Sequence, residues 1–132
     1  MGPLVMMNIV EIARQQPSTR PAMINVATDF TRYPGGRYRQ DGDFSGEEFR
    51  DDVLVPALRK ARATSTRVVV VLDGATGYPS SFLEEAFGGL VRERLFSAGD
   101  LKALLEVRAG PLYESYRVLA ERYIASAKPK RD

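Results

Sequence analysis

The chain has 132 residues, of which 44% are hydrophobic and 27% charged, and its formal net charge is +2. This size and composition predict one globular domain with a hydrophobic core. Much of the positive excess lies in Lys128, Lys130 and Arg131, which argues against a nucleic-acid partner. The longest apolar run is far shorter than the ~20 residues that span a membrane, and no signal peptide begins the chain. We therefore expect a cytoplasmic protein without a membrane partner.

Two residue types are missing from the chain, and their absence excludes much chemistry. There is no cysteine, so disulfides, thiolate nucleophiles and zinc–sulfur sites are excluded. There is no histidine, so the Ser-His-Asp arrangement and the commonest general base are excluded as well. We therefore expect a protein that is not an enzyme, with no catalytic residues, no metal and no cofactor.

The first part of the chain predicts a lead-in, a strand and a hairpin. Residues 1–22 are predicted to be a lead-in, and residues 1–5 look like a remnant of an expression vector. A strand is predicted over 23–30, with Ile24, Val26 and Phe30 facing inward. Pro34-Gly35-Gly36 predicts the tip of a hairpin whose return strand is 37–40.

The same hairpin carries Arg32, Arg37 and Arg39 beside its glycines, and two interpretations remain open. The simpler one is a solvated hairpin. The other is a small-ligand module, in which guanidinium groups and glycine amides bind an anion or nucleotide and Tyr33 and Tyr38 stack on a base.

A helix start is predicted at Ser45. Ser45 and Glu48 have the spacing of a capping box, and Phe44 and Phe49 stand where a hydrophobic staple is found. The predicted helix continues to Ala61, and Pro56 is expected to kink or break it.

The central segment 68–91 predicts a strand followed by a helix. Val68 to Leu72 is an unbroken apolar run, typical of a strand buried on both faces. Residues 75–79 are a predicted loop, and Ser81 with Glu84 predicts a capping box at the next helix start. The pair Gly88-Gly89 lies inside that helix, where glycine costs roughly 1 kcal/mol relative to alanine, so we expect a close approach to the neighbouring sheet.

The last part of the chain predicts a loop at 97–100, a helical turn at 101–105, a short strand at 105–108 and a final helix after Gly110-Pro111. The chain is expected to fray from Ala125, with a basic tail at 127–132. The tyrosines Tyr113, Tyr116 and Tyr123 are compatible with a homodimer interface or with the core. The expected buried face of the final helix comprises Leu112, Tyr116, Leu119, Ala120, Tyr123 and Ile124.

Alternation of strands and helices predicts an α/β fold. The segments RYPGGRYRQDGDFSGEEFRDDVLVPAL and LDGATGYPSSFLEEAFGGLV resemble the STAS-like domain family of unknown function. STAS denotes the fold of sulphate transporters and anti-sigma-factor antagonists. The resemblance spans residues 23–124 and implies a mixed sheet of about four strands with helices packed against it, in a domain over 23–126. It also implies a non-enzymatic bacterial regulator that binds a protein partner, either a histidine-kinase-like ATPase or an anti-sigma factor.

In the antagonist branch of this fold, a serine at the start of the corresponding helix is phosphorylated by the partner kinase, and phosphorylation breaks the contact. The resemblance therefore implies that Ser80 or Ser81 is the phosphoacceptor. The simpler interpretation of the two serines is capping of the helix, with Ser81 as the N-cap. The antagonist motif has Asp before the serines and Gly after them, where this chain has Pro79 and Phe82. The implied partner surface lies over residues 77–90 and uses Asp73, Tyr78, Phe82, Glu84 and Glu85.

Overall fold

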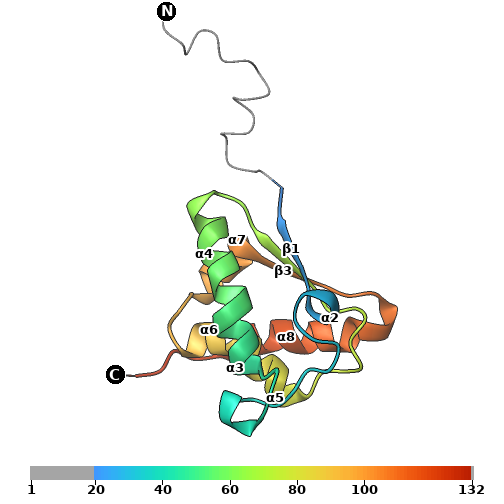
Figure 1. Ribbon diagram of the computed structural model, residues 1–132. Helices are drawn as coiled ribbons and strands as arrows, with labels where there is room; N and C mark the ends of the chain where they lie inside the picture. The colour runs from blue at the N-terminus through green and yellow to red at the C-terminus, as the bar shows by residue number, and fades with distance from the viewer. Residues whose placement is uncertain (1–19, 132) are drawn as a thin grey trace, which may run out of the picture.

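The computed structural model describes residues 20–131, and Figure 1 shows strands and helices alternating along them. The predicted lead-in therefore lies mostly outside the described residues. The elements are β1 Ala22–Asn25, α2 Val26–Asp29, η2 Arg39–Asp41, α3 Gly46–Glu48, η3 Phe49–Leu54, α4 Val55–Ala63, β2 Val68–Val71, α5 Ser80–Leu83, η4 Glu84–Gly88, α6 Gly89–Arg92, α7 Ala98–Leu104, β3 Leu105–Arg108, η5 Pro111–Tyr113 and α8 Glu114–Ser126. The segments η3 and η4 are π-helical, and η2 and η5 are 3₁₀ turns.

The described strands form one parallel sheet of three strands in the order β1-β2-β3. This confirms the predicted α/β class, with fewer strands than expected and with parallel pairing in place of a mixed sheet. The helices cover the face that carries Ile24, Val70 and Val107, which belong to the hydrophobic core. The opposite face carries Met23, which is 55% exposed, and Arg108, which is also exposed.

The first strand is shorter than predicted, because it ends at Asn25. The Asn25 side chain accepts a hydrogen bond from the Thr28 N–H at 3.2 Å, and the Asn25 N–H donates to Asp29 at 2.7 Å. These bonds cap a helical turn over Val26–Asp29. The predicted strand over 23–30 is therefore wrong beyond Asn25, although Ile24 and Val26 do face the core.

The predicted return strand at 37–40 is absent, because this segment binds the start of the next helix instead. The Gly35 N–H donates to the Phe44 carbonyl at 2.9 Å, the Gly46 N–H to Gly36 at 2.9 Å, and the Glu47 N–H to Arg37 at 3.0 Å. These bonds use backbone groups that would otherwise be available for strand pairing. Residues 35–45 therefore form a folded loop rather than a hairpin.

The helix predicted at Ser45 forms, and α3, η3 and α4 follow one another without a gap from Gly46 to Ala63. The Ser45 side chain accepts the Glu48 N–H at 3.0 Å, as expected for an N-cap. The expected break at Pro56 is absent. The Val55 N–H donates to the Arg50 carbonyl, five residues back, and this wider π turn gives the proline ring room.

The glycine pair in the second helix is explained by helix and side-chain packing rather than by the sheet. A Cβ on Gly88 would lie 3.3 Å from the Tyr123 carbonyl oxygen of α8. A Cβ on Gly89 would meet the Arg50 side chain. The expected close approach is therefore real, but the sheet is not the neighbour. The glycines make room for α8 and for the Arg50 side chain.

The last helix and the tail also differ from expectation. Ala120 is the fully buried residue of α8, and Leu112 is 89% exposed, so Leu112 does not belong to the buried face. The tail does not fray after 125, because α8 continues to Ser126 and Lys130 then binds the helix α6. Its backbone N–H donates to the Arg92 carbonyl at 2.8 Å, and its ammonium lies 2.7 Å from Glu93.

Candidate functional site

The loop between β2 and α5 is held in place by two tyrosines. The Tyr78 hydroxyl donates to the Leu72 carbonyl at 2.7 Å, and the Tyr113 hydroxyl donates to the Ala75 carbonyl at 2.6 Å. Tyr78 is buried, and burial raises its pKa, so its hydroxyl stays protonated and keeps donating. The loop therefore presents the start of the helix at 80 from a fixed position.

Asp73 ties the end of β2 to the loop after β3. Its carboxylate accepts the Gly110 N–H, at 3.0 Å to one oxygen and 3.1 Å to the other. A Cβ on Gly110 would lie 2.7 Å from this carboxylate, so the glycine permits the contact. Asp73 is half-buried, and the geometry gives it a structural role at the carboxyl end of the sheet.

Ser80 and Ser81 are the first two residues of α5, and neither caps it. The N-cap residue is Pro79, and no side chain caps this end. Ser80 is exposed and Ser81 is half-buried. Within residues 20–131, neither hydroxyl has a hydrogen-bond partner in the structure. The predicted capping box of Ser81 and Glu84 was therefore wrong, and both hydroxyls are left unused by the fold.

Glu84 and Glu85 belong to a group of five charged side chains, here called the arginine–glutamate cluster: Arg37, Arg50, Glu84, Glu85 and Arg92. Glu84 binds Arg37 and Arg92. Glu85 binds Arg50, and it lies 2.8 Å from Arg92 and 3.3 Å from Arg37. The cluster joins the loop before α3, the π-helical segment η3 and the helix at 80–92.

The centre of the cluster is buried. The side chains of Arg50 and Glu85 are 7% and 3% exposed. Burial alone would lower the pKa of Arg50, but its hydrogen bonds and charge contacts with Asp51 and Glu85 outweigh burial and raise that pKa. Arg50 is therefore held charged beside Glu85, and the two side chains come from η3 and η4, which contact each other.

The structure separates the predicted partner-binding residues into two kinds. Tyr78, Phe82 and Glu85 are buried, so their side chains are not available on this surface. Asp73 and Glu84 are half-buried and already bound to Gly110 and to two arginines. Of the predicted side chains, the exposed one is Ser80.

The three arginines predicted to bind an anion do not form a free cationic group. Arg37 belongs to the arginine–glutamate cluster, and Arg39 lies 2.6 Å from Asp52. Arg32 is exposed, and its guanidinium makes no ion pair with the described residues. Its backbone carbonyl accepts the Thr76 N–H at 2.8 Å, which fixes Arg32 beside the loop that leads to Ser80.

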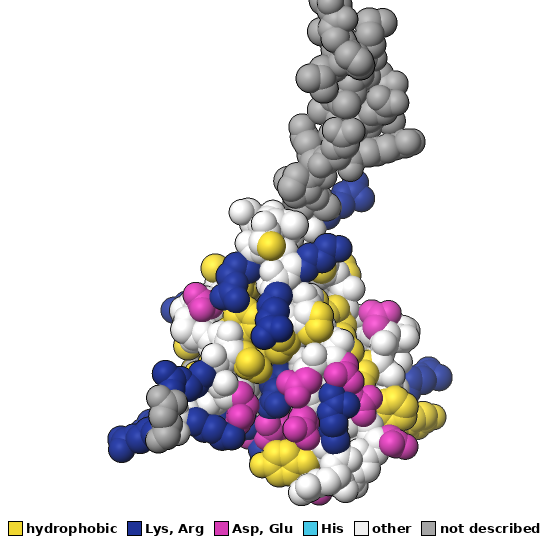
Figure 2. Space-filling view, turned by 60° about the vertical axis from the view of Figure 1, so that its left-hand side comes forward, with side chains coloured by type: hydrophobic (Ala, Val, Ile, Leu, Met, Phe, Trp, Pro, Cys, Tyr) yellow, Lys and Arg dark blue, Asp and Glu magenta, His cyan; other side chains and the backbone are white. Residues whose placement is uncertain are grey.

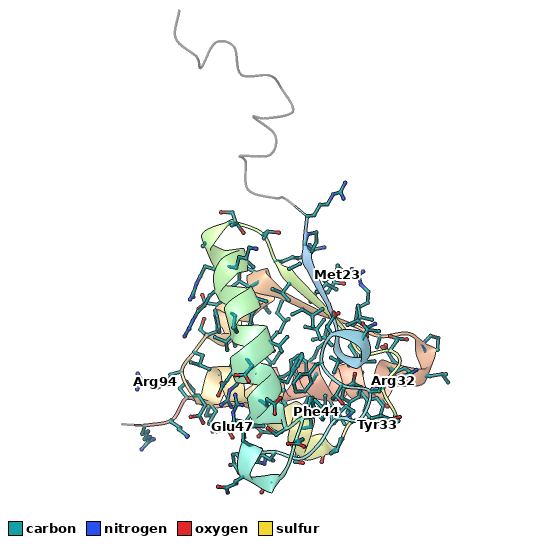
Figure 3. All side chains as sticks on the ribbon, in the orientation of Figure 1. Met23, Arg32, Tyr33, Phe44, Glu47 and Arg94 are labelled. Carbon is teal, nitrogen blue, oxygen red and sulfur yellow. The ribbon has the colours of Figure 1, made fainter. Side chains whose placement is uncertain are left out.

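Exposed aromatic side chains lie near the same loop, and the sequence analysis considered Tyr33 only as a stacking residue for a base and Phe44 only as part of a hydrophobic staple. Tyr33 is 67% exposed and Phe44 is 40% exposed. Phe44 has φ of +57°, a strained conformation for a bulky side chain. Its ring lies 5.5 Å from Phe30, which in turn lies 6.5 Å from Phe82 of α5. We call Arg32, Tyr33, Phe44 and Ser80 the Ser80 surface (Figure 3 labels the first three).

The tyrosines of the last helical region pack inside the molecule. Tyr116 lies 5.2 Å from the Tyr78 ring and 6.1 Å from the Tyr113 ring, centroid to centroid. These half-buried tyrosines pack against the core, and the homodimer stays a prediction.

On the face that Figure 2 shows, acidic and basic side chains lie side by side in the lower part, and mainly basic ones lie above them. Within residues 20–131, no group of three or more acidic side chains is placed to hold a metal ion. None of the helices in this part of the chain is both long and apolar enough to cross a membrane.

Comparison with known proteins gives one match. Residues 45–108 match the family model described as the STAS-like domain of unknown function (DUF4325). No curated protein and no solved structure gives a significant match. The matched region runs from the N-cap Ser45 to the end of β3, narrower than the resemblance seen in the sequence. Residues 45–108, about half of the chain, are therefore similar to the STAS-like domains of unknown function.

Proposed function

We propose that this STAS-like domain is a non-enzymatic, cytoplasmic regulatory module that binds a partner protein through the Ser80 surface. The observation that carries the proposal is the exposed, unbonded Ser80 hydroxyl at the start of a helix whose preceding loop is rigidly held. Exposed aromatic side chains are typical of protein-binding surfaces. The resemblance suggests a partner of the kinase-like ATPase or anti-sigma-factor type.

Phosphorylation would switch this contact at Ser80 rather than at Ser81. A phosphate on Ser80 would lie at a helix N-terminus, where free amides and the helix dipole favour negative charge. Ser80 stands four residues before Glu84 alone, whereas Ser81 stands three and four residues before Glu84 and Glu85, which share its side of the helix. A phosphate there would be repelled by two carboxylates and would compete for the arginines that bind them.

Several observations support a role that is not catalytic. The chain has no histidine and no cysteine. The Asp73 carboxylate, the acidic group nearest the loop, is already bonded to the Gly110 amide. A small-ligand function at Arg37 and Arg39 has less support, because both guanidinium groups are engaged by carboxylates.

The test is affinity capture from native lysate with the full chain and its Ser80→Glu variant. We expect Ser80→Glu to lose the partner, and Tyr33→Ala and Phe44→Ala to weaken it. The matched controls are Ser115→Glu and Val118→Ala, which change exposed positions of α8. A partner that all variants retain would contradict the assignment of the Ser80 surface, and the absence of any captured protein would contradict the interaction module.

A further inference from the structure

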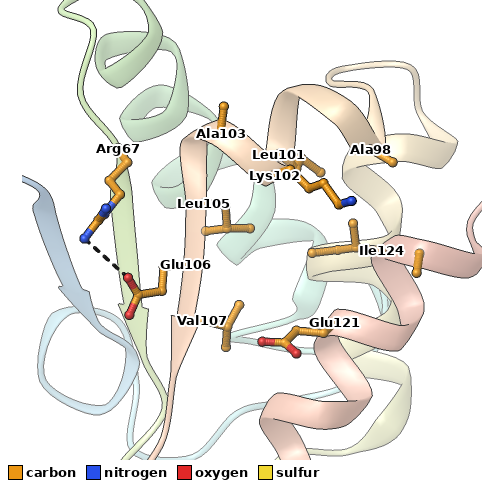
Figure 4. A pocket seen from close by; sticks show the side chains of 11 residues that line it. Arg67, Ala98, Leu101, Lys102, Ala103, Leu105, Glu106, Val107, Glu121 and Ile124 are labelled. Carbon is orange, nitrogen blue, oxygen red and sulfur yellow. Dashed lines mark ion pairs between the residues drawn. The ribbon is translucent and has the colours of Figure 1, made fainter.

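A groove of about 680 Å³ lies between α7, the strand β3 and α8 (Figure 4). The side chains of Leu105, Val107 and Ile124 line it from β3 and α8, and Leu101 lines it from α7. The volume is in the range of small-ligand sites. The groove shares no residue with the Ser80 surface, so it is a separate feature of the molecule.

The groove is open because α8 packs mainly against η4 and not along the whole of β3. β3 is an edge strand of the described sheet, so no further strand of residues 20–131 covers this side. Leu105 and Ile124 remain only half-buried, and Ala125 leaves space where a larger side chain would fill the groove. An apolar surface is therefore left in contact with solvent, at a place where small residues keep it accessible.

The charged side chains at the rim of the groove favour a ligand with a negative charge. Glu106 lies 3.5 Å from Arg67 and 2.8 Å from Arg108, and Glu121 lies 2.7 Å from Arg117, which also binds Glu114. Each carboxylate at the rim therefore has a basic partner. Lys102 also lines the groove, and among the described residues it forms no ion pair. The uncompensated charge at the rim is therefore positive, next to an apolar surface.

We propose that this groove binds a carboxylate that carries an unbranched apolar chain, with the chain along β3 and the carboxylate at Lys102. The four residues of β3 span about 13 Å at roughly 3.3 Å per residue. This length is close to that of an extended decanoate ion, which makes sodium decanoate a suitable probe. Uncharged decanol has the same chain and tests the contribution of Lys102.

The experiment is isothermal titration calorimetry of the full chain with decanoate below the concentration at which it forms micelles. We expect saturable binding, weaker binding of decanol, and about tenfold weaker binding of decanoate to Lys102→Glu. Lys60→Glu makes the same charge change at an exposed position outside the groove, and it should bind as the wild type does. Ala125→Trp, which fills the groove from an exposed position, should abolish binding.

A second measurement does not depend on variants. In the amide spectrum of the ¹⁵N-labelled wild-type chain, decanoate should shift signals of α7, β3 and the C-terminal half of α8. The proposal is overturned if no saturable binding occurs, if Lys102→Glu and Lys60→Glu weaken binding equally, or if the shifts lie elsewhere. Binding of an extended apolar peptide without binding of decanoate would also overturn it, in favour of strand addition to β3.

Discussion

At the scale of single residues, Glu85 binds three arginines and is the most deeply buried charged side chain among the described residues. Its side chain is 3% exposed, and Arg50, its nearest partner, is 7% exposed. A buried ion pair adds little net stability over an apolar pair, because both charges lose their hydration. Removing one partner is different, because the other charge then stays buried without compensation.

We therefore predict that Glu85→Gln lowers the free energy of unfolding by about 3–5 kcal/mol. Urea unfolding at neutral pH measures this change. The control is Arg39→Ala, which breaks the exposed pair with Asp52, and it should cost far less because solvent screens exposed charges. Equal losses in the two variants would mean that the buried cluster does not stabilise the helix packing.

Gly46 gives a second prediction at this scale. Its added Cβ would meet the Phe82 carbonyl oxygen and would lie 3.1 Å from the Glu85 Cβ. Gly46→Ala should therefore destabilise the fold by about 1–3 kcal/mol, the usual cost of overpacking. Gly99 lies in α7 with 3.7 Å to its nearest atom, Ser97 Oγ. Gly99→Ala should stabilise the fold by up to about 1 kcal/mol, and thermal unfolding of both variants tests the pair.

At the scale of the elements, two serines at helix starts have opposite expected behaviour. Ser45 is buried and caps the first long helix, so Ser45→Ala should cost about 1–2 kcal/mol. Ser80 is exposed and caps nothing, so Ser80→Ala should change stability by less than about 0.5 kcal/mol. Chemical denaturation distinguishes them. A large loss of stability in Ser80→Ala would mean that Ser80 caps the helix after all, and it would contradict the proposed function.

Elements with a local signal could be predicted from the sequence. The unbroken run of valines predicted β2, and the Ser45 cap and the strand near 105–108 were found as well. Ser81 was misread as a cap because its spacing to Glu84 satisfies the motif, while Pro79 takes the position and long-range arginines take Glu84. A capping motif shows only that a local hydrogen bond is sterically possible. Contacts with distant segments determine whether that bond forms.

The misread segments depend on contacts that sequence patterns do not contain. Val26 suits a buried strand and a buried helical turn equally well, and the Asn25 side chain decides for the turn. Arg50 and Glu85 are 35 residues apart in the sequence, and no periodicity links them. Glu84 and Glu85, predicted to lie on the partner surface, therefore bind arginines inside the fold instead.

At the scale of the whole molecule, the C-terminal segment returns to α6 and binds it through Lys130. A parallel sheet is usually covered on both faces, whereas here one face carries exposed side chains such as Met23. Stability therefore depends on packing among the helices, and the return of the chain to α6 through Lys130 adds to that packing. A segment that the sequence predicted as a frayed basic tail is thus part of the fold.

This contact has a pH dependence whose sign follows from Glu93. The hydrogen bond from Lys130 lowers the pKa of Glu93 below its ordinary value. Its contribution is therefore present above about pH 4.3, the ordinary pKa of glutamate, and it is lost as the pH falls through the lowered pKa of the folded state. Glu93 is 27% exposed, so solvent screening keeps the contribution below about 1 kcal/mol.

We predict that Lys130→Ala lowers stability at pH 7 and that the difference from the wild type disappears at an acid pH below the lowered pKa of Glu93, where Glu93 is protonated in both proteins. Urea unfolding at the two pH values measures this, and a carboxyl titration by NMR should show the Glu93 pKa returning toward its ordinary value in the variant. The control is Lys128→Ala, which removes an equal charge from an exposed position that forms no ion pair in the described chain. If Lys128→Ala gave the same pH-dependent loss, general charge on the tail would be responsible. A loss specific to Lys130→Ala would show that one ion pair, and not the basic character of the tail, attaches the C-terminus to α6.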